Sequence, residues 1–257
     1  MRFYCGDLHI HTVLSPCAQY TMVPTLIVER ALERGIDFIA ITDHNSSENV
    51  EAVMQAAKAT ELVVLPGMEL ETREEVHVVV LFEAAQQARR WQETVYAHLP
   101  DLPNDEDAFG VQLVVNSEDE LVCREGRRLL IACDLSVDQV FEQVGRLGGF
   151  CIPAHVDRPS YSLLNTLGFI PPTLDVPAVE VSRRVRTRDA ARRLPGVGAR
   201  EVIWSSDAHS LEDVGSVRTC FEMREPTLSE LILACRGHEG RRVRWASIGE
   251  EGHQAED

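Results

Sequence analysis

The sequence has a single lysine, Lys58, so arginine carries nearly all of its positive charge. Lysine and arginine together number 25 against 41 aspartates and glutamates, which gives a formal net charge of −16. Broad, sequence-independent binding of nucleic acid depends on basic side chains that neutralise phosphates. We therefore expect no long nucleic acid among the partners. A small phosphorylated ligand is compatible with this charge, because bound cations can outweigh local carboxylates.

No C-x-x-C pair occurs among the seven cysteines, and their number is odd. A chain of 257 residues can bury a substantial core without a disulfide framework. Cys5, Cys151 and Cys220 lie in apolar runs and are predicted to be buried thiols. No apolar run has membrane-spanning length, and the N-terminus lacks the apolar core of a signal peptide. We expect a cytoplasmic protein with no membrane partner.

Short apolar runs alternate with helix-like stretches along most of the chain. Strand-like runs occupy 3–5, 36–41, 62–65, 76–82, 150–155, 178–181, 202–206 and 217–223. Such alternation predicts an α/β fold in which a parallel sheet is covered by helices. About seven units favour a closed, TIM-like barrel over an open sheet, and in such barrels the chemistry lies where strands end. We expect one domain over residues 1–237 and a polar C-terminal tail over 238–257.

The middle of the chain departs from this alternation. Residues 99–107 are acidic and contain proline, and 111–115 and 120–124 flank a polar turn that predicts a β-hairpin. We interpret residues 100–130 as an excursion from the main fold. It either covers the site, forms an interface or is a solvated loop without a role.

Ligand-capable side chains recur at the predicted strand ends. Asp7, His9 and His11 are two residues apart, so on a strand they point to one side. The other members of this set are Asp43, His44, Glu69, His77, His155, Asp207 and His209. Imidazoles and carboxylates together bind zinc, manganese or iron.

Six histidines beside Glu69 and Asp207 are too many for one tetrahedral metal, and we predict two or three divalent metal ions (Zn, Mn or Fe). Glu69 is the natural bridging ligand, since a carboxylate has two oxygens to share. Two metals roughly 3.5–4 Å apart can clamp a phosphate and activate a bridging water as the nucleophile. Glu69 and Asp207 are therefore the candidate catalytic residues.

These motifs, in this order, resemble the PHP (polymerase and histidinol phosphatase) family. The resemblance rests on D-x-H-x-H, Thr-Asp-His, Gly-Met-Glu, the single His77, Pro-Ala-His and Ser-Asp-Ala-His, and extends over about 3–215. It implies a distorted (β/α)7 barrel with a trinuclear metal site that hydrolyses phosphoesters. It assigns the first metal to His9, His11, Glu69 and Asp207, the second to Glu69, His77 and His155, and the third to His44 and His209.

One position departs from the family pattern. Relatives often place a His or Asp shortly after the second histidine as a further ligand for the third metal, and this chain has Ser15-Pro16-Cys17 there. Cys17 is either a thiolate ligand, which would favour zinc or iron, or a loop thiol beside a weaker site.

Four more residues are candidates for supporting roles. Arg158 and Arg183 follow strand ends and could bind phosphate oxygens, although a plain surface arginine is the more common case. Asp7 and Asp43 either orient a ligand histidine or stabilise a turn.

The leading hypothesis is a metal-dependent phosphoesterase that acts on a small phosphorylated metabolite or nucleotide. The alternatives are an exonuclease acting on short oligonucleotides, a metal-containing sensor or interaction module without turnover, and a non-phosphate hydrolase such as an amidohydrolase. The net charge argues against a nuclease, and so does the absence of any evident basic groove or aromatic platform in the sequence.

Overall fold

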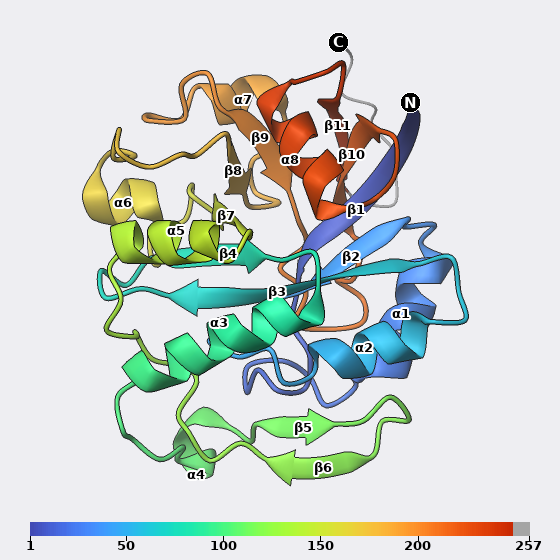
Figure 1. The fold of residues 1–257 in the computed structure, drawn as a ribbon, viewed down its shortest axis with the longest axis vertical. Coiled ribbons are helices and arrows are strands. Elements are labelled where there is room, and N and C mark those ends of the chain that lie inside the picture. Colours follow the sequence, from blue (N-terminus) through green and yellow to red (C-terminus); the bar gives the residue numbers. More distant parts are fainter. Residues whose placement is uncertain (249–257) are drawn as a thin grey trace.

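A computed structural model describes residues 1–248 of the chain. Seven strands form one curled sheet in the order β11-β10-β1-β2-β3-β4-β7 (Figure 1). They are β1 (Arg2–Ile10), β2 (Phe38–Ile41), β3 (Val63–Glu71), β4 (His77–Leu81), β7 (Phe150–Pro153), β10 (Val217–Met223) and β11 (Arg242–Ile248). β1, β2 and β3 are mutually parallel, and every other neighbouring pair in this sheet is antiparallel.

A second, two-stranded parallel sheet continues the curve. It consists of β8 (Ala178–Val181) and β9 (Glu201–Trp204). The N–H of Val156, just after β7, donates to the carbonyl of Glu180 on β8 at 2.9 Å. Beyond β9, Ala208 exchanges backbone hydrogen bonds of 3.0 and 3.2 Å with His11 and His9 at the end of β1. The strand ends therefore meet in a ring.

The expectation of a distorted (β/α)7 barrel is confirmed only as a mixed α/β fold with a curled sheet. The departure begins at the connection from β3 to β4, which spans only residues 72–76. A parallel crossover needs a dozen or more residues, so this short turn makes β4 antiparallel. Glu69 also lies inside β3 rather than beyond its end, because the strand continues through Pro66 and Gly67 to Glu71.

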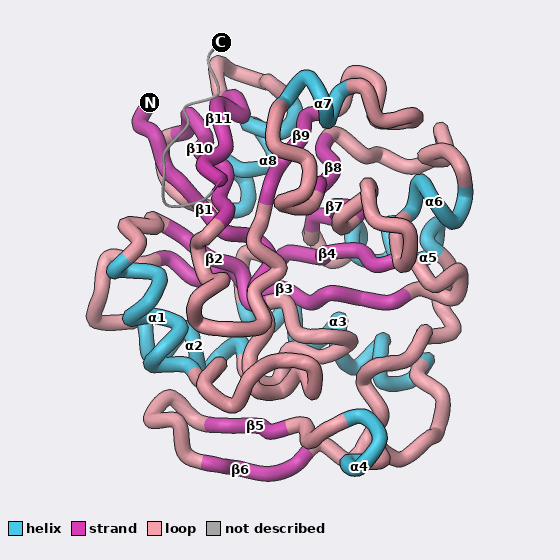
Figure 2. The backbone as a smooth tube through the Cα atoms, turned by 180° about the vertical axis from the view of Figure 1, so that it is seen from behind, coloured by secondary structure: helices cyan, strands magenta, loops and turns pink. Residues whose placement is uncertain are grey.

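The larger helices pack on the outer face of the sheets. α3, α5 and α8 lie in front of the strands in Figure 1 and behind them in Figure 2. The helices are α1 (Pro24–Glu33), α2 (Val50–Ala57), α3 (Ala85–His98), α4 (Glu106–Phe109), α5 (Val137–Arg146), α6 (Leu163–Leu167), α7 (Arg188–Arg192) and α8 (Leu228–Arg236). No helix in the described part of the chain is long and apolar enough to cross a membrane.

The predicted hairpin is present as β5 (Leu113–Val115) and β6 (Leu121–Arg124), which form a separate sheet. It lies apart from the main sheet, at the bottom of both views (Figure 2). The buried Asn49 side chain holds it, accepting from the N–H of Val115 and donating to the carbonyl of Leu113, both at 3.0 Å. The excursion is thus an ordered layer fixed to the N-terminus of α2.

The C-terminal segment differs from the predicted tail. Residues 242–248 form β11, which pairs with β10 and adds an edge strand to the sheet. Apolar residues such as Val243 supply the strand pattern, and Val243 is buried against the core. The acidic end of the predicted tail lies outside the described residues.

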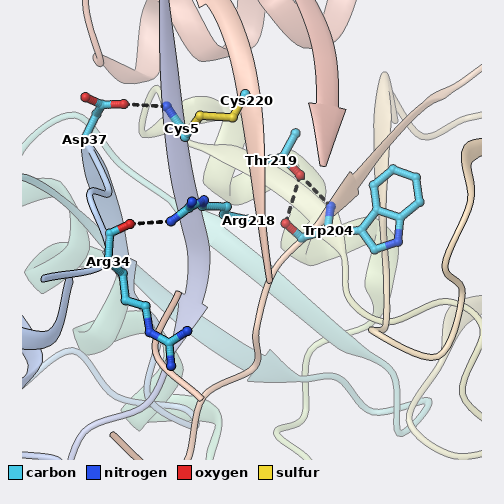
Figure 3. Close-up of a disulfide and its surroundings, with 7 residues drawn as sticks. All are labelled: Cys5, Arg34, Asp37, Trp204, Arg218, Thr219 and Cys220. Carbon is cyan, nitrogen blue, oxygen red and sulfur yellow. Dashed lines mark hydrogen bonds between the residues drawn. A yellow bond between two sulfur atoms is a disulfide. The ribbon is translucent and has the colours of Figure 1, made fainter. Parts of the chain in front are cut away.

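The prediction that Cys5 and Cys220 are thiols is wrong, because the two form a disulfide (Figure 3). They stand directly opposite each other in the antiparallel register of β1 and β10. The register of two strands 215 residues apart cannot be derived from one sequence. Nearby, the N–H of Cys5 donates to the Asp37 carboxylate at 2.7 Å, so this edge of β1 is held from both sides.

The disulfide can be tested by counting thiols. Unreduced, denatured protein should show five reactive thiols per chain, because two of the seven cysteines are bridged. Cys220→Ala should lower the free energy of unfolding by about 2–4 kcal/mol, since the bridge restricts the unfolded chain. Cys123→Ala, at an exposed free cysteine, is the control and should leave stability unchanged. Seven thiols, or equal stability of both variants, would contradict the bridge.

Candidate metal centre

The ring of strand ends brings the predicted ligands together at one point. His9 and His11 at the end of β1 are fully buried. The Nε2 atom of His9 lies 3.3 Å from Glu69 Oε2 and 3.3 Å from Asp207 Oδ1. The Nε2 atom of His11 lies 3.3 and 3.2 Å from the same two oxygens. These four side chains present one ligand atom each to a common position, as predicted for the first metal.

Glu69 is the centre of the cluster. Its Oε1 lies 2.7 Å from His77 Nδ1 and 3.1 Å from His155 Nε2, and its Oε2 lies 3.1 Å from His44 Nδ1. Only 1% of its surface is exposed. Each oxygen of this carboxylate therefore faces a different set of imidazoles, which is the arrangement of a bridging ligand.

A third group consists of His11, His44 and His209, whose nitrogens lie within 4.8 Å of one another. Burial lowers the pKa of His44 to about 3 and that of His209 to about 4, so both imidazoles are neutral at pH 7. Neutral imidazole is the form that binds a metal. In the structure the second group consists of His44, Glu69 and His77, and His11 joins the third. The predicted ligand His155 contacts Glu69 at 3.1 Å but belongs to none of the three groups.

An observation that is independent of the motifs also indicates that these residues suit divalent cations. His9 Nε2 and Glu69 Oε2 are buried and have no hydrogen-bond partner among the described residues. An unsatisfied buried polar atom costs about 1–3 kcal/mol, and such atoms are rare in native proteins. Both atoms face the position shared by the first group, so a cation bound there would satisfy them together.

Cys17 is not brought into any of the three groups. The residue as a whole is exposed, but its sulfur is partly shielded from water. This shielding, together with the charges of Glu69 and Asp207, raises the pKa of the thiol to about 12. Its role as a ligand stays a prediction.

The structure treats the two predicted substrate arginines differently. Arg158 donates from Nη2 to Asp207 Oδ2 at 2.5 Å, which places its guanidinium at the edge of the cluster. Arg183 instead pairs with Asp213 at 2.6 Å, and 58% of its side chain is exposed. Of these two arginines, only Arg158 contacts a predicted metal ligand.

Sequence reasoning missed Glu180 as a part of the site. This residue of β8 is 2% exposed, and its carboxylate oxygens lie 3.1 and 3.2 Å from His9 Nδ1. It also accepts a hydrogen bond from the N–H of His155. A carboxylate on the outer nitrogen fixes the tautomer of a ligand histidine and makes it more basic. The sequence does contain a signal for this role, since Glu180 is an acidic residue within an otherwise apolar strand.

Asp43 and Asp7 support the predicted ligands indirectly, through groups that lie between. Asp43 accepts from Ser15 Oγ at 2.7 Å, and the same hydroxyl lies 3.0 Å from His11 Nδ1, so Asp43 orients His11 through Ser15. Asp7 accepts from the N–H of Ser206 and of Gly215, both at 2.9 Å. It therefore fixes the turn that carries Asp207.

Two ligands are held in strained backbone conformations. His155 has φ of +30° and Asp207 has φ of +51°, values that favour glycine. Such conformations persist where the surrounding structure imposes them, and they cluster at functional sites. Here the N–H of His155 donates to Glu180, and the N–H of Ser206, which precedes Asp207, donates to Asp7. These hydrogen bonds help to hold the two conformations.

Comparisons with known proteins identify a family and several similar folds. The PHP domain model matches residues 7–161, and the model of a PHP-associated region matches 184–237. The uncharacterized protein YqxK of Bacillus subtilis is 24% identical over 276 residues, which covers 95% of this chain and 64% of that protein. An inferred metal-dependent phosphoesterase from Bifidobacterium adolescentis has a similar fold, with a TM-score of 0.52, 20% identity and coverage of 79% of this chain and 87% of its own.

The fold is also similar to that of the lesion-specific endonuclease PfuEndoQ from Pyrococcus furiosus. The TM-score is 0.66 at 19% identity, and the match covers 96% of this chain and 59% of that one. Endonuclease Q has also been solved with a 27-mer duplex that carries an abasic lesion at the active site, again with a TM-score of 0.66. The chain thus spans about 60% of the length of the endonuclease and of YqxK.

This likeness overturns the expectation that long nucleic acid is excluded. Endonuclease Q, whose fold matches 96% of this chain, forms a complex with a DNA duplex. The net charge did not exclude nucleic acid, because charge summed over the chain says little about the charge beside the site, where a substrate is bound.

The role of Glu180 can be tested by metal binding. Glu180→Gln keeps the shape of the side chain but removes the charge that faces His9 Nδ1. We expect the affinity for Zn²⁺ or Mn²⁺ to fall about 10–100-fold, measured by titration calorimetry on protein stripped of metal. Glu33→Gln, at an exposed residue of α1, should bind metal as the unaltered protein does. Equal affinities in all three proteins would show that Glu180 does not support the centre.

Proposed function

The chain belongs to the PHP domain family, and on that premise we propose that it is a metal-dependent phosphoesterase that hydrolyses its substrate with a metal-activated water. The single observation that carries the proposal is the Glu69 carboxylate, which lies within 3.3 Å of five imidazoles. This arrangement offers two ion positions that share the Glu69 carboxylate and a third position among His11, His44 and His209.

When bound, such ions supply Lewis acidity toward a phosphoryl oxygen and lower the pKa of a coordinated water toward about 7. Glu69 would hold neighbouring ions through its two oxygens. Asp207 would bind the first ion with Oδ1 while Oδ2 holds the guanidinium of Arg158. Arg158 can thus present its remaining N–H groups to phosphate oxygens, in the planar geometry that suits them.

The residues around the ligands keep this arrangement rigid. Glu180 fixes His9, and Asp43 fixes His11 through Ser15. Because the ligands are buried and oriented before a substrate binds, little reorganisation is needed during the reaction. No serine or cysteine nucleophile is required, and the exposed Cys17 is left without a part in this scheme.

The first candidate substrate is a small phosphorylated metabolite or nucleotide. A second is a polynucleotide, and the observation that favours it is the similarity of the fold to an endonuclease over 96% of this chain. Both substrates call for the same reaction at phosphorus, so one panel can compare them.

We expect protein purified without chelator to contain two to three divalent metals per chain. It should release phosphate from nucleoside monophosphates or sugar phosphates, or cut a labelled oligonucleotide with or without an abasic site. Elemental analysis and the two assays on one sample give the measurement. Metal without hydrolysis of any phosphoester would contradict the proposal and favour a sensor or a non-phosphate hydrolase.

Glu69→Ala should remove turnover and lower the metal content, because every ion in the cluster loses a ligand or a neighbour. Circular dichroism should show that the fold is kept. Glu61→Ala, at an exposed residue before β3, is the matched control. Full activity in Glu69→Ala would exclude this centre as the catalytic one.

A further inference from the structure

A strongly basic segment follows β8 in this otherwise acidic protein. Residues 183–193 contain six arginines and one acidic residue, Asp189. Arg183 pairs with Asp213 and Arg188 with Glu201. The remaining four are exposed and have no acidic partner among the described residues: Arg184, Arg186, Arg192 and Arg193. We refer to 183–193 as the arginine segment.

The first residues of the arginine segment lie close to the metal centre. Ser182, immediately before it, donates from its N–H and its hydroxyl to the Asp157 carboxylate, each at 2.6 Å. Asp157 is the neighbour of Arg158, which contacts Asp207. Two residues before Ser182 lies Glu180, the partner of His9. The segment therefore begins at the rim of the site.

An aromatic ring lies on the same rim. Tyr161 stacks on the imidazole of His77, with ring centroids 4.6 Å apart and planes inclined by 21°. The residue has φ of +56°, and its carbonyl accepts a hydrogen bond of 2.9 Å from the N–H of His77. It is nevertheless 47% exposed. A strained backbone thus holds a large ring open to solvent beside a predicted metal ligand.

We infer that Tyr161 and the arginine segment form a binding surface for a polynucleotide strand at the metal centre. Tyr161 would stack on a base next to the phosphate that is hydrolysed, and the exposed arginines would contact the backbone further along. Proteins that bind single strands combine these two features, aromatic platforms and a basic path. The inference rests on the proposed function and names residues that would select a strand over a free phosphate.

The arginine contacts can be measured through the salt dependence of binding. A fluorescein-labelled, single-stranded 20-mer is titrated with the metal-loaded protein at several salt concentrations, and anisotropy gives the affinity. Each lost phosphate contact lowers the slope of log affinity against log salt by about 0.7 for single strands. Arg184→Gln/Arg186→Gln should therefore reduce the slope by about 1.4.

The matched control is Arg89→Gln/Arg90→Gln, an equal change of charge on the outer helix α3, where Arg89 pairs with Glu51 of α2. It should leave the slope unchanged. Equal slopes for both double variants, or no binding by the unaltered protein, would overturn the inference. So would displacement of the 20-mer by polyglutamate as readily as by unlabelled DNA, which would indicate an acidic protein partner.

Tyr161 needs a test of its own. Stacking is worth about 1–3 kcal/mol per base, so Tyr161→Ala should weaken binding of the 20-mer by about fivefold or more, and Tyr161→Phe should restore it. A 20-mer of abasic residues should bind equally to all three proteins. Loss of binding in both Tyr161 variants, with the fold intact by circular dichroism, would contradict stacking, as would full binding by Tyr161→Ala.

The two proposals fail in different ways. If small phosphoesters are hydrolysed and the 20-mer does not bind, the phosphoesterase stands and this surface is excluded. If the 20-mer binds with the expected dependence on Tyr161 and the arginines but no phosphoester is hydrolysed, the surface stands and the proposed reaction is wrong.

Discussion

The arrangement of the site depends on the burial of one carboxylate, Glu69, among five imidazoles. Removing a carboxylate from water is costly unless opposite charge or hydrogen bonds compensate for it. Burial raises the pKa of Glu69, but the imidazoles around it have the larger effect and keep the pKa well below its ordinary range. An ionised carboxylate in this position needs cations, and bound metals would provide them. The surrounding strand ends are arranged to hold five imidazoles against these two oxygens.

A second layer of carboxylates fixes that arrangement. Glu180, Asp43 and Asp7 are buried, and each binds either a ligand histidine, a hydroxyl between itself and a histidine, or the turn that carries a ligand. They come from three different strand ends, so the curled sheet places them around the cluster rather than along one element. The strain at His155 and Asp207 is maintained by these contacts. Rigid ligands, positioned before binding, are what metal-assisted hydrolysis requires.

The distribution of charge is as informative as its sum. A net charge of −16 describes the chain as a whole, yet six of its arginines lie within residues 183–193. This segment begins at the rim of the site beside Ser182 and continues to the far end of β9, where Arg188 pairs with Glu201. Screening limits the reach of a surface charge to about 8–10 Å at physiological salt. A substrate at the metal centre would therefore respond to nearby groups such as Arg158, which contacts Asp207, more than to the acidic surface elsewhere.

The sequence alone predicted the residues of the candidate metal centre, because metal ligands are few in kind and their order along the chain is distinctive. All eight histidine, glutamate and aspartate ligands that it predicted, from His9 to His209, meet in one cluster. The tertiary structure alone decided what depends on distant pairing. It placed Cys5 opposite Cys220 and Glu180 beside His9. It also added β11 to the sheet and stacked Tyr161 on His77. In each of these contacts the local sequence gives no sign of the partner. Packing of the whole fold, including the register of its strands, brings the residues together.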